Sequence, residues 1–99
     1  AAQTVKLIIS QRAAADLERL HAFLLDKDPT VARRATGALA KAIQSLNSLP
    51  DRGRPSGIPG ARELIVPFGR SAYVLRYAHR EQAGEIIILR IWHGREARE

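Results

Sequence analysis

The chain has no cysteine and no long hydrophobic run, and each absence excludes a class of protein. Without cysteine, its 99 residues hold no disulfide, no thiolate metal ligand and no cysteine nucleophile. No apolar stretch approaches the roughly 20 residues of a membrane-spanning helix, and the first residues, Ala1 to Lys6, lack a signal-peptide core. We therefore expect a cytoplasmic, single-domain protein over 1–99, with an ordered core over about 4–95 and a frayed polar tail over 96–99.

Charge is the most uneven feature of the composition. Sixteen Lys and Arg residues against ten Asp and Glu residues give a net charge of +6, which favours an acidic partner, either nucleic acid or an acidic protein segment. Lysine is absent after Lys41, so every later cation is an arginine, whose planar guanidinium suits phosphate or carboxylate. A genome rich in G and C would produce the same bias, so the arginines alone do not identify the partner.

Hydrophobic spacing predicts the element order β-α-α-β-β-β. Helical spacing of Leu and Ala begins after Ser10 and again after Asp28-Pro29, which are favourable helix starts. The short gap between the helices imposes an antiparallel hairpin, and short gaps between the last three strands predict an antiparallel meander with the first strand at one edge. The expected elements are a strand over 4–9, helices over 11–26 and 29–48, a loop over 50–60, and strands over 62–66, 72–77 and 85–92.

The sequence therefore predicts an α+β fold in which the helical hairpin packs on one face of a small, mostly antiparallel sheet. The run 85–92 is apolar at successive positions until Arg90. This pattern predicts a central strand that is covered on both faces.

Short motifs follow one another along the chain in a specific order. They are Ala15-Asp16-Leu17, Asp28-Pro29, Leu49-Pro50 with Gly53-Arg54, Arg62-Glu63-Leu64, Tyr73-x-x-x-Tyr77, and Ile91-Trp92-His93-Gly94-Arg95. In this order, over about residues 5–95, the sequence resembles the ParE/RelE superfamily of toxins from bacterial type II toxin–antitoxin systems.

The resemblance implies a RelE/ParE-like fold and a co-expressed, ParD-like antitoxin whose acidic, often disordered tail folds along the toxin. A charge of +6 suits such a tail. We expect the antitoxin to dock beside the helical hairpin, at a groove that includes Leu20, Leu24, Leu39 and Ile43. Because the same side chains also face the sheet, we expect most of their surface to belong to the core.

The resemblance leaves the target open between two classes. RelE-like members cleave mRNA in the ribosome, whereas ParE-like members poison DNA gyrase and have no known nuclease chemistry. RNA cleavage requires a base, an acid and cations on the phosphate, and RelE-like nucleases place Lys or Arg on the middle strands. Here those stretches carry Leu64, Ile65, Val66 and Val74. Arg62 and Arg76 are nearby, and alternation puts Arg76 on the face of Val74, opposite Tyr73 and Tyr77, but one displaced arginine does not restore the set. This favours a ParE-like gyrase inhibitor; a toxin relic that only binds antitoxin is a third alternative.

Each alternative has its own candidate residues. A nuclease would use His93, Arg95, Arg76 and Tyr77, whereas a gyrase poison would meet its target through Arg54, Arg62, Trp92, His93 and Arg95. His21 within a helix and His79 in a hairpin turn are expected to have surface or packing roles. The three histidines show no ligand spacing, so we expect neither a metal nor a cofactor.

Overall fold

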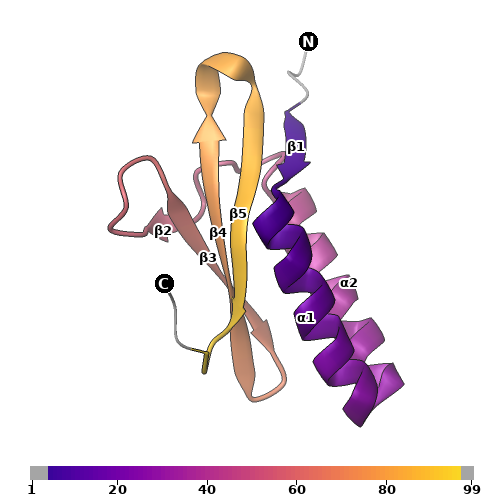
Figure 1. Cartoon of the computed structure of the whole chain (residues 1–99). Helices are drawn as coiled ribbons and strands as arrows, with labels where there is room; N and C mark the ends of the chain where they lie inside the picture. The colour runs from indigo at the N-terminus through magenta and orange to yellow at the C-terminus, as the bar shows by residue number, and fades with distance from the viewer. Residues whose placement is uncertain (1–4, 97–99) are drawn as a thin grey trace.

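Two helices pack on one face of a five-stranded sheet in the computed structural model, which describes residues 5–96 (Figure 1). The elements are β1 (Lys6–Ile9), α1 (Gln11–Lys27), α2 (Pro29–Ser45), β2 (Arg54–Pro55), β3 (Arg62–Phe68), β4 (Ser71–Arg80), a 3₁₀ turn η1 (Glu81–Ala83) and β5 (Glu85–His93). The sheet order is β1-β5-β4-β3-β2, with β1 parallel to β5 and every other pair antiparallel. The predicted α+β class and the helical hairpin are thus confirmed, and β2 is a short addition inside the expected loop.

Both helices begin at the residues that the sequence indicates. The Ser10 hydroxyl accepts the N–H of Ala13 at 3.0 Å, and the Asp28 carboxylate accepts the N–H of Thr30 at 2.9 Å. Each of these bonds satisfies a donor that the first helical turn leaves free. Within the described residues, neither helix is long and apolar enough to cross a membrane.

The core lies between the helices and one face of the sheet. Leu20 from α1 and Leu39 from α2 meet Leu75 of β4 and Ile88 of β5 in one buried cluster. Full burial of one such side chain contributes about 2 kcal/mol. This cluster fixes which face of every strand points toward the helices.

The helices cover only one face of β5, so the predicted cover on both faces is wrong for the first half of the strand, although Trp92 near its end is buried on the other face. Ile86 and Ile88 point toward the helices and are fully buried, whereas Ile87 and Leu89 point toward the open face and are only partly buried. The reason is that both helices lie on the same side of the sheet. The pairing of β4 with β5 also shifts register beside Leu89, and this irregularity returns Ile91 to the core face.

Two further expectations are corrected. His79 lies within β4 rather than in a hairpin turn, because β4 continues to Arg80 and the turn is made by η1 and Gly84. Glu96, the first residue of the expected tail, continues the ordered chain: its N–H donates to the His93 carbonyl at 2.9 Å, and the N–H of Gly94 before it donates to the Ala72 carbonyl at 2.7 Å. Residue 4 of the expected first strand and residues 97–99 of the expected tail lie outside the described residues.

A substitution at Gly53 tests how tightly the loop before β2 packs against Tyr77. Its N–H donates to the Tyr77 hydroxyl at 2.9 Å, and a Cβ added at Gly53 would lie 2.7 Å from that oxygen. We expect Gly53→Ala to lower the free energy of unfolding by about 2 kcal/mol. Gly37→Ala is the matched control, because a Cβ there meets nothing within 4 Å and should raise stability by about 0.5 kcal/mol. Urea denaturation measures both; equal stability of the Gly53 variant and the parent would contradict the packing.

Candidate functional site

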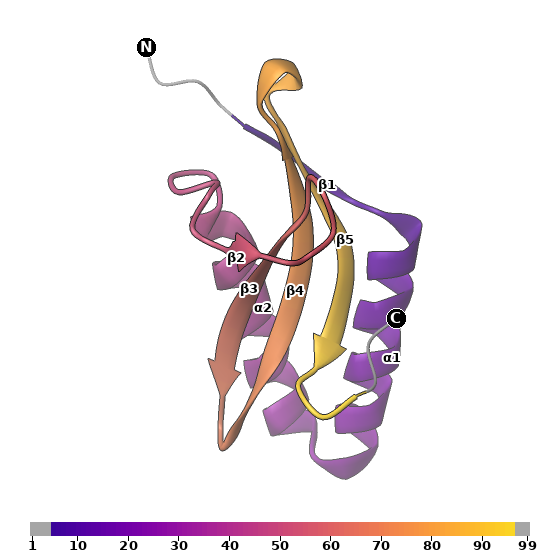
Figure 2. The ribbon, with the colours of Figure 1, turned by 90° about the vertical axis from the view of Figure 1, so that its left-hand side faces the viewer.

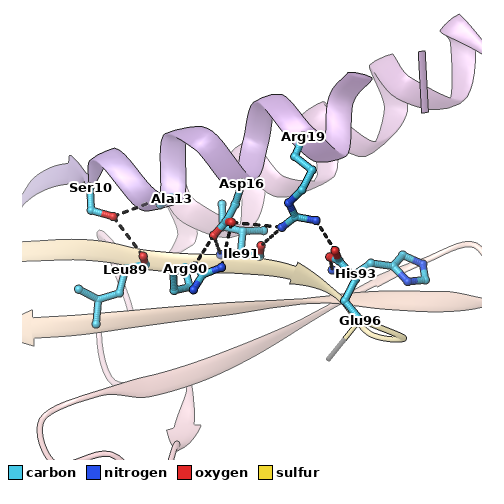
Figure 3. A network of polar contacts seen from close by, with 9 residues as sticks. All are labelled: Ser10, Ala13, Asp16, Arg19, Leu89, Arg90, Ile91, His93 and Glu96. Carbon is cyan, nitrogen blue, oxygen red and sulfur yellow. Dashed lines mark hydrogen bonds and ion pairs between the residues drawn. The ribbon is translucent and has the colours of Figure 1, made fainter. Parts of the chain in front are cut away.

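The free edge of β5 is closed by side chains of the first helix. Strand β1 pairs only with the first four residues of β5, from Glu85 to Ile88, before the chain turns into α1. Beyond that point the Ser10 hydroxyl donates to the Leu89 carbonyl at 3.1 Å, and the Asp16 carboxylate accepts the N–H of Ile91 at 2.9 Å (Figure 3). Polar side chains thus make the bonds that a longer β1 would have made.

Asp16 is the centre of this network. It is only 5% exposed, and it accepts two bonds from Arg90, at 2.8 and 3.2 Å, and one from Arg19 at 3.1 Å. Burial on its own would raise the pKa of the Asp16 carboxyl, but the bonds from Arg90, the Ile91 N–H and Arg19 lower it below its usual value. The carboxylate is therefore charged at neutral pH and fastens α1 to β5.

Figure 2 shows the face of the sheet that the helices leave open. From Asp16, at the edge of β5, a row of paired charges runs across this face through Arg90 and Arg76 to Glu63. The guanidinium groups of Arg90 and Arg76 lie over the Trp92 ring, at 4.8 and 4.7 Å from its centroid. Arg76 then bonds to Glu63 at 2.9 and 3.2 Å. The two arginines stack on Trp92 through cation–π contacts, and each one is matched by a carboxylate, so the row has no excess charge.

Residues 94–96, directly after β5, form a turn beside α1, which we call the C-terminal turn. The His93 ring meets Tyr73 edge to face, with centroids 5.6 Å apart, and its Nδ1 accepts the N–H of Arg95 at 3.2 Å. The Glu96 carboxylate accepts the N–H of His93 at 2.7 Å and also forms an ion pair with Arg19. The turn thereby holds His93 and Arg95 next to the helix.

A groove of about 760 Å³ lies between α1, the β3–β4 hairpin and this turn. We call it the C-terminal groove. Its lining residues are Arg19, Leu20, Phe23, Leu24, Phe68, Gly69, Arg70, Tyr73, His93, Arg95 and Glu96. Phe23 is 61% exposed on its wall, and no ion pair within residues 5–96 engages Arg70 or Arg95. The groove therefore combines apolar walls with a basic rim.

Sequence reasoning found only part of this groove. Of the side chains expected at the antitoxin surface, Leu20 and Leu24 line it, whereas Leu39 and Ile43 are buried in the core. Phe23 was missed. Its position off the buried stripe of α1 was the one signal that could have revealed an apolar wall facing solvent.

The residues expected to meet the target do not form one patch. His93 and Arg95 line the C-terminal groove, but Trp92 is 2% exposed. Arg62 pairs across from Tyr77 while His93 pairs across from Tyr73, so these two levels lie about 13 Å apart along β4. Arg54, in β2 beyond Arg62, belongs to the distant group.

The nuclease candidates are also dispersed. The Tyr77 hydroxyl points to Gly53 within the fold, whereas Arg76 lies on the opposite face, as the alternation along β4 predicted. His93 stands at the far end of the sheet with its Nδ1 already engaged. The geometry does not assemble these side chains around one point.

Arg62 holds the loop before β2. Its Nη1 donates to the Gly53 carbonyl at 2.8 Å, and its Nε lies 3.6 Å from Asp51, which also contacts His79 at 3.0 Å. This cluster borders a second, open hollow of about 580 Å³. Among the residues that the structure describes, no group of three or more His, Asp or Glu side chains is placed to hold a metal ion.

Comparison with known proteins gives a consistent result. The sequence model of the ParE toxin of the type II toxin–antitoxin system parDE matches residues 7–98. The chain is 43% identical to Toxin RelE1 of Caulobacter vibrioides over 95 residues, covering 96% of this chain and 99% of that protein. The fold is similar to that in the chromosomal ParDE system of P. aeruginosa, with 26% identity, a TM-score of 0.76, and 92% and 97% of the two chains covered. It is also similar to a free mutant of E. coli toxin RelE, with 17% identity, a TM-score of 0.61, and 89% and 81% covered.

Asp16→Asn tests the network at the edge of β5. Because the change removes the buried carboxylate charge that Arg90 and Arg19 contact, we expect a loss of about 3 kcal/mol of unfolding free energy at pH 7. Asp26→Asn, at an exposed site on the same helix, should change stability by less than about 0.5 kcal/mol. Chemical denaturation measures both.

The difference in stability between the parent and Asp16→Asn should also depend on pH, with a defined sign. The folded pKa of Asp16 is lowered, so its stabilisation is complete above the unfolded pKa of about 4 and is lost as pH falls through the lower folded value. The gap between the parent and Asp16→Asn should therefore shrink below about pH 4. A gap that stays constant into strong acid would contradict the charged state of Asp16.

Proposed function

Because the chain belongs to the ParE toxin family and is a toxin of a type II toxin–antitoxin module, we propose that it arrests growth in the cytoplasm by binding DNA gyrase, without catalysing a reaction. The observation that carries this proposal is the charge row across the open face of the sheet. A phosphate approaching Arg76 or Arg90 would have to displace Glu63 or Asp16 from a bond of 2.9 or 2.8 Å. Such a surface is poorly suited to hold RNA for cleavage.

The contacts of His93 support the same proposal. A general base must reach the proton that it removes, but Nδ1 of His93 is occupied by the N–H of Arg95, and its ring rests on Tyr73. Arg95 cannot act as a base, because a guanidinium stays protonated. Binding is thus the activity that these side chains favour.

We assign the target contact to the end of the sheet, where His93 and Arg95 stand together, with Arg70 of the β3–β4 hairpin across the groove. Exposed arginines with adjacent aromatic side chains are frequent hot spots of protein interfaces. Trp92 would contribute indirectly: because it is buried, it would hold the end of β5 in place and would not contact the target. Arg54 and Arg62 would lie outside this contact.

The partner that neutralises the toxin would be a cognate antitoxin with an acidic, amphipathic segment. The apolar walls at Leu20, Leu24 and Phe23 fit the apolar face of such a segment, and the basic rim fits its carboxylates. Because Arg95 and His93 belong to both surfaces, the bound antitoxin would cover the target contact. Neutralisation would then follow from occlusion.

Two assays performed with the purified full chain separate the alternatives. One is a gyrase supercoiling assay, and the other is a translation-coupled mRNA cleavage assay. Accumulation of cleaved DNA complexes in the first supports the proposal. Codon-phased cuts in the second would replace it with ribosome-dependent endonuclease activity, and silence in both would indicate a relic that only binds antitoxin.

Single alanine substitutions test the target surface. We expect Arg95→Ala and His93→Ala each to weaken growth arrest and gyrase inhibition about tenfold or more, as loss of a hot-spot contact of about 1.4 kcal/mol would. Arg80→Ala removes an exposed arginine at the opposite end of β4 and should have little effect. If both variants fold and arrest growth as strongly as the parent, the surface is wrongly assigned.

A further inference from the structure

Glu96 is the one acidic side chain among the described residues that line the C-terminal groove. The other charged lining residues are Arg19, Arg70 and Arg95. One carboxylate oxygen of Glu96 faces Nη1 of Arg19, and the other accepts the N–H of His93. A negative charge therefore sits at the rim of a groove whose remaining charges are positive.

We propose that Glu96 is an internal substitute for a carboxylate of the protein partner: it occupies the anion position beside Arg19, and an acidic segment binds by displacing it. This inference rests on the proposed docking of such a segment in the C-terminal groove. It assigns to Glu96 the role of limiting the affinity for an acidic partner.

The two arms of the Arg19 guanidinium differ in how firmly they are held. Nη2 donates to Asp16 at 3.1 Å and lies 3.4 Å from the Ile91 carbonyl, both within the network at the edge of β5. Nη1 meets only Glu96 among the described residues, and the Glu96 side chain is 34% exposed on a short turn. The Glu96 bond is thus the one that an incoming carboxylate can replace without disturbing Asp16.

The charge of Glu96 also reaches the floor of the groove. Burial raises the pKa of the Tyr73 hydroxyl, and the charge of Glu96 raises it further. The negative charge of Glu96 would also repel a partner carboxylate that enters the groove, unless Glu96 moves away. Exchange at Arg19 removes this repulsion and keeps the arginine paired, so the number of ion pairs is unchanged.

Glu96→Gln separates charge from structure. The amide oxygen can still accept the N–H of His93, so the turn is retained while the charge is lost. The probes are the full-length cognate antitoxin, and a version whose tail Asp and Glu residues are changed to Asn and Gln. We expect Glu96→Gln to bind the acidic antitoxin about three- to fivefold more tightly, the scale of one partly exposed ion pair, and to leave binding of the amide version unchanged. Glu18→Gln, an equal charge change at an exposed site of α1 outside the groove lining, should alter both affinities well under twofold.

Phe23→Ala provides the second arm, because it tests docking in the groove independently of charge. If it weakens both antitoxins and Glu96→Gln tightens only the acidic one, the inference is supported. If Phe23→Ala weakens binding but Glu96→Gln leaves it unchanged, weakens it, or tightens both antitoxins equally, the role of Glu96 is refuted while groove docking stands. If Phe23→Ala has no effect, the antitoxin docks elsewhere, and the inference fails together with that part of the proposed function.

Discussion

A buried carboxylate, Asp16, completes the sheet where its edge strand ends too early. Strand β1 covers four residues of β5, and a longer β1 is impossible because Ser10 begins a helix. The next N–H on that edge, at Ile91, would be buried without a partner, which is costly, but Asp16 accepts it at 2.9 Å. Since a buried anion needs cations, Arg90 and Arg19 must lie where they do, and their positions determine the rest of the site.

The same constraint divides the cations into two groups. Arg76 and Arg90 are held on Trp92 between Glu63 and Asp16, so they stabilise the open face and contribute little to its potential. Arg70 and Arg95 stand at the rim of the C-terminal groove, where no ion pair within residues 5–96 engages them. A chain with a net charge of +6 thereby presents basic groups beside an apolar groove, which suits an acidic protein segment better than a nucleic-acid backbone.

Local signals in the sequence predicted most of the fold. Ser10 and Asp28-Pro29 start both helices because capping depends only on adjacent residues, and alternation placed Arg76 opposite the tyrosines of β4. The site was harder, because its contacts join distant parts of the chain: Asp16 and Ile91 are 75 residues apart. The register shift beside Leu89 and the groove wall at Phe23 likewise depend on how α1 meets the end of the sheet, which no spacing within one segment records.

Hydrogen exchange at the Ile91 amide tests the role of Asp16 most directly, because this N–H donates to a side chain and not to a neighbouring strand. If Asp16 closes the edge of the sheet, the amide should exchange only through global unfolding, as slowly as amides in the middle of the β4–β5 ladder. Exchange through local opening, at a rate close to that of the η1 turn, would mean that the edge of β5 is frayed. The network that positions Arg19, the C-terminal turn and the groove would then not exist in solution.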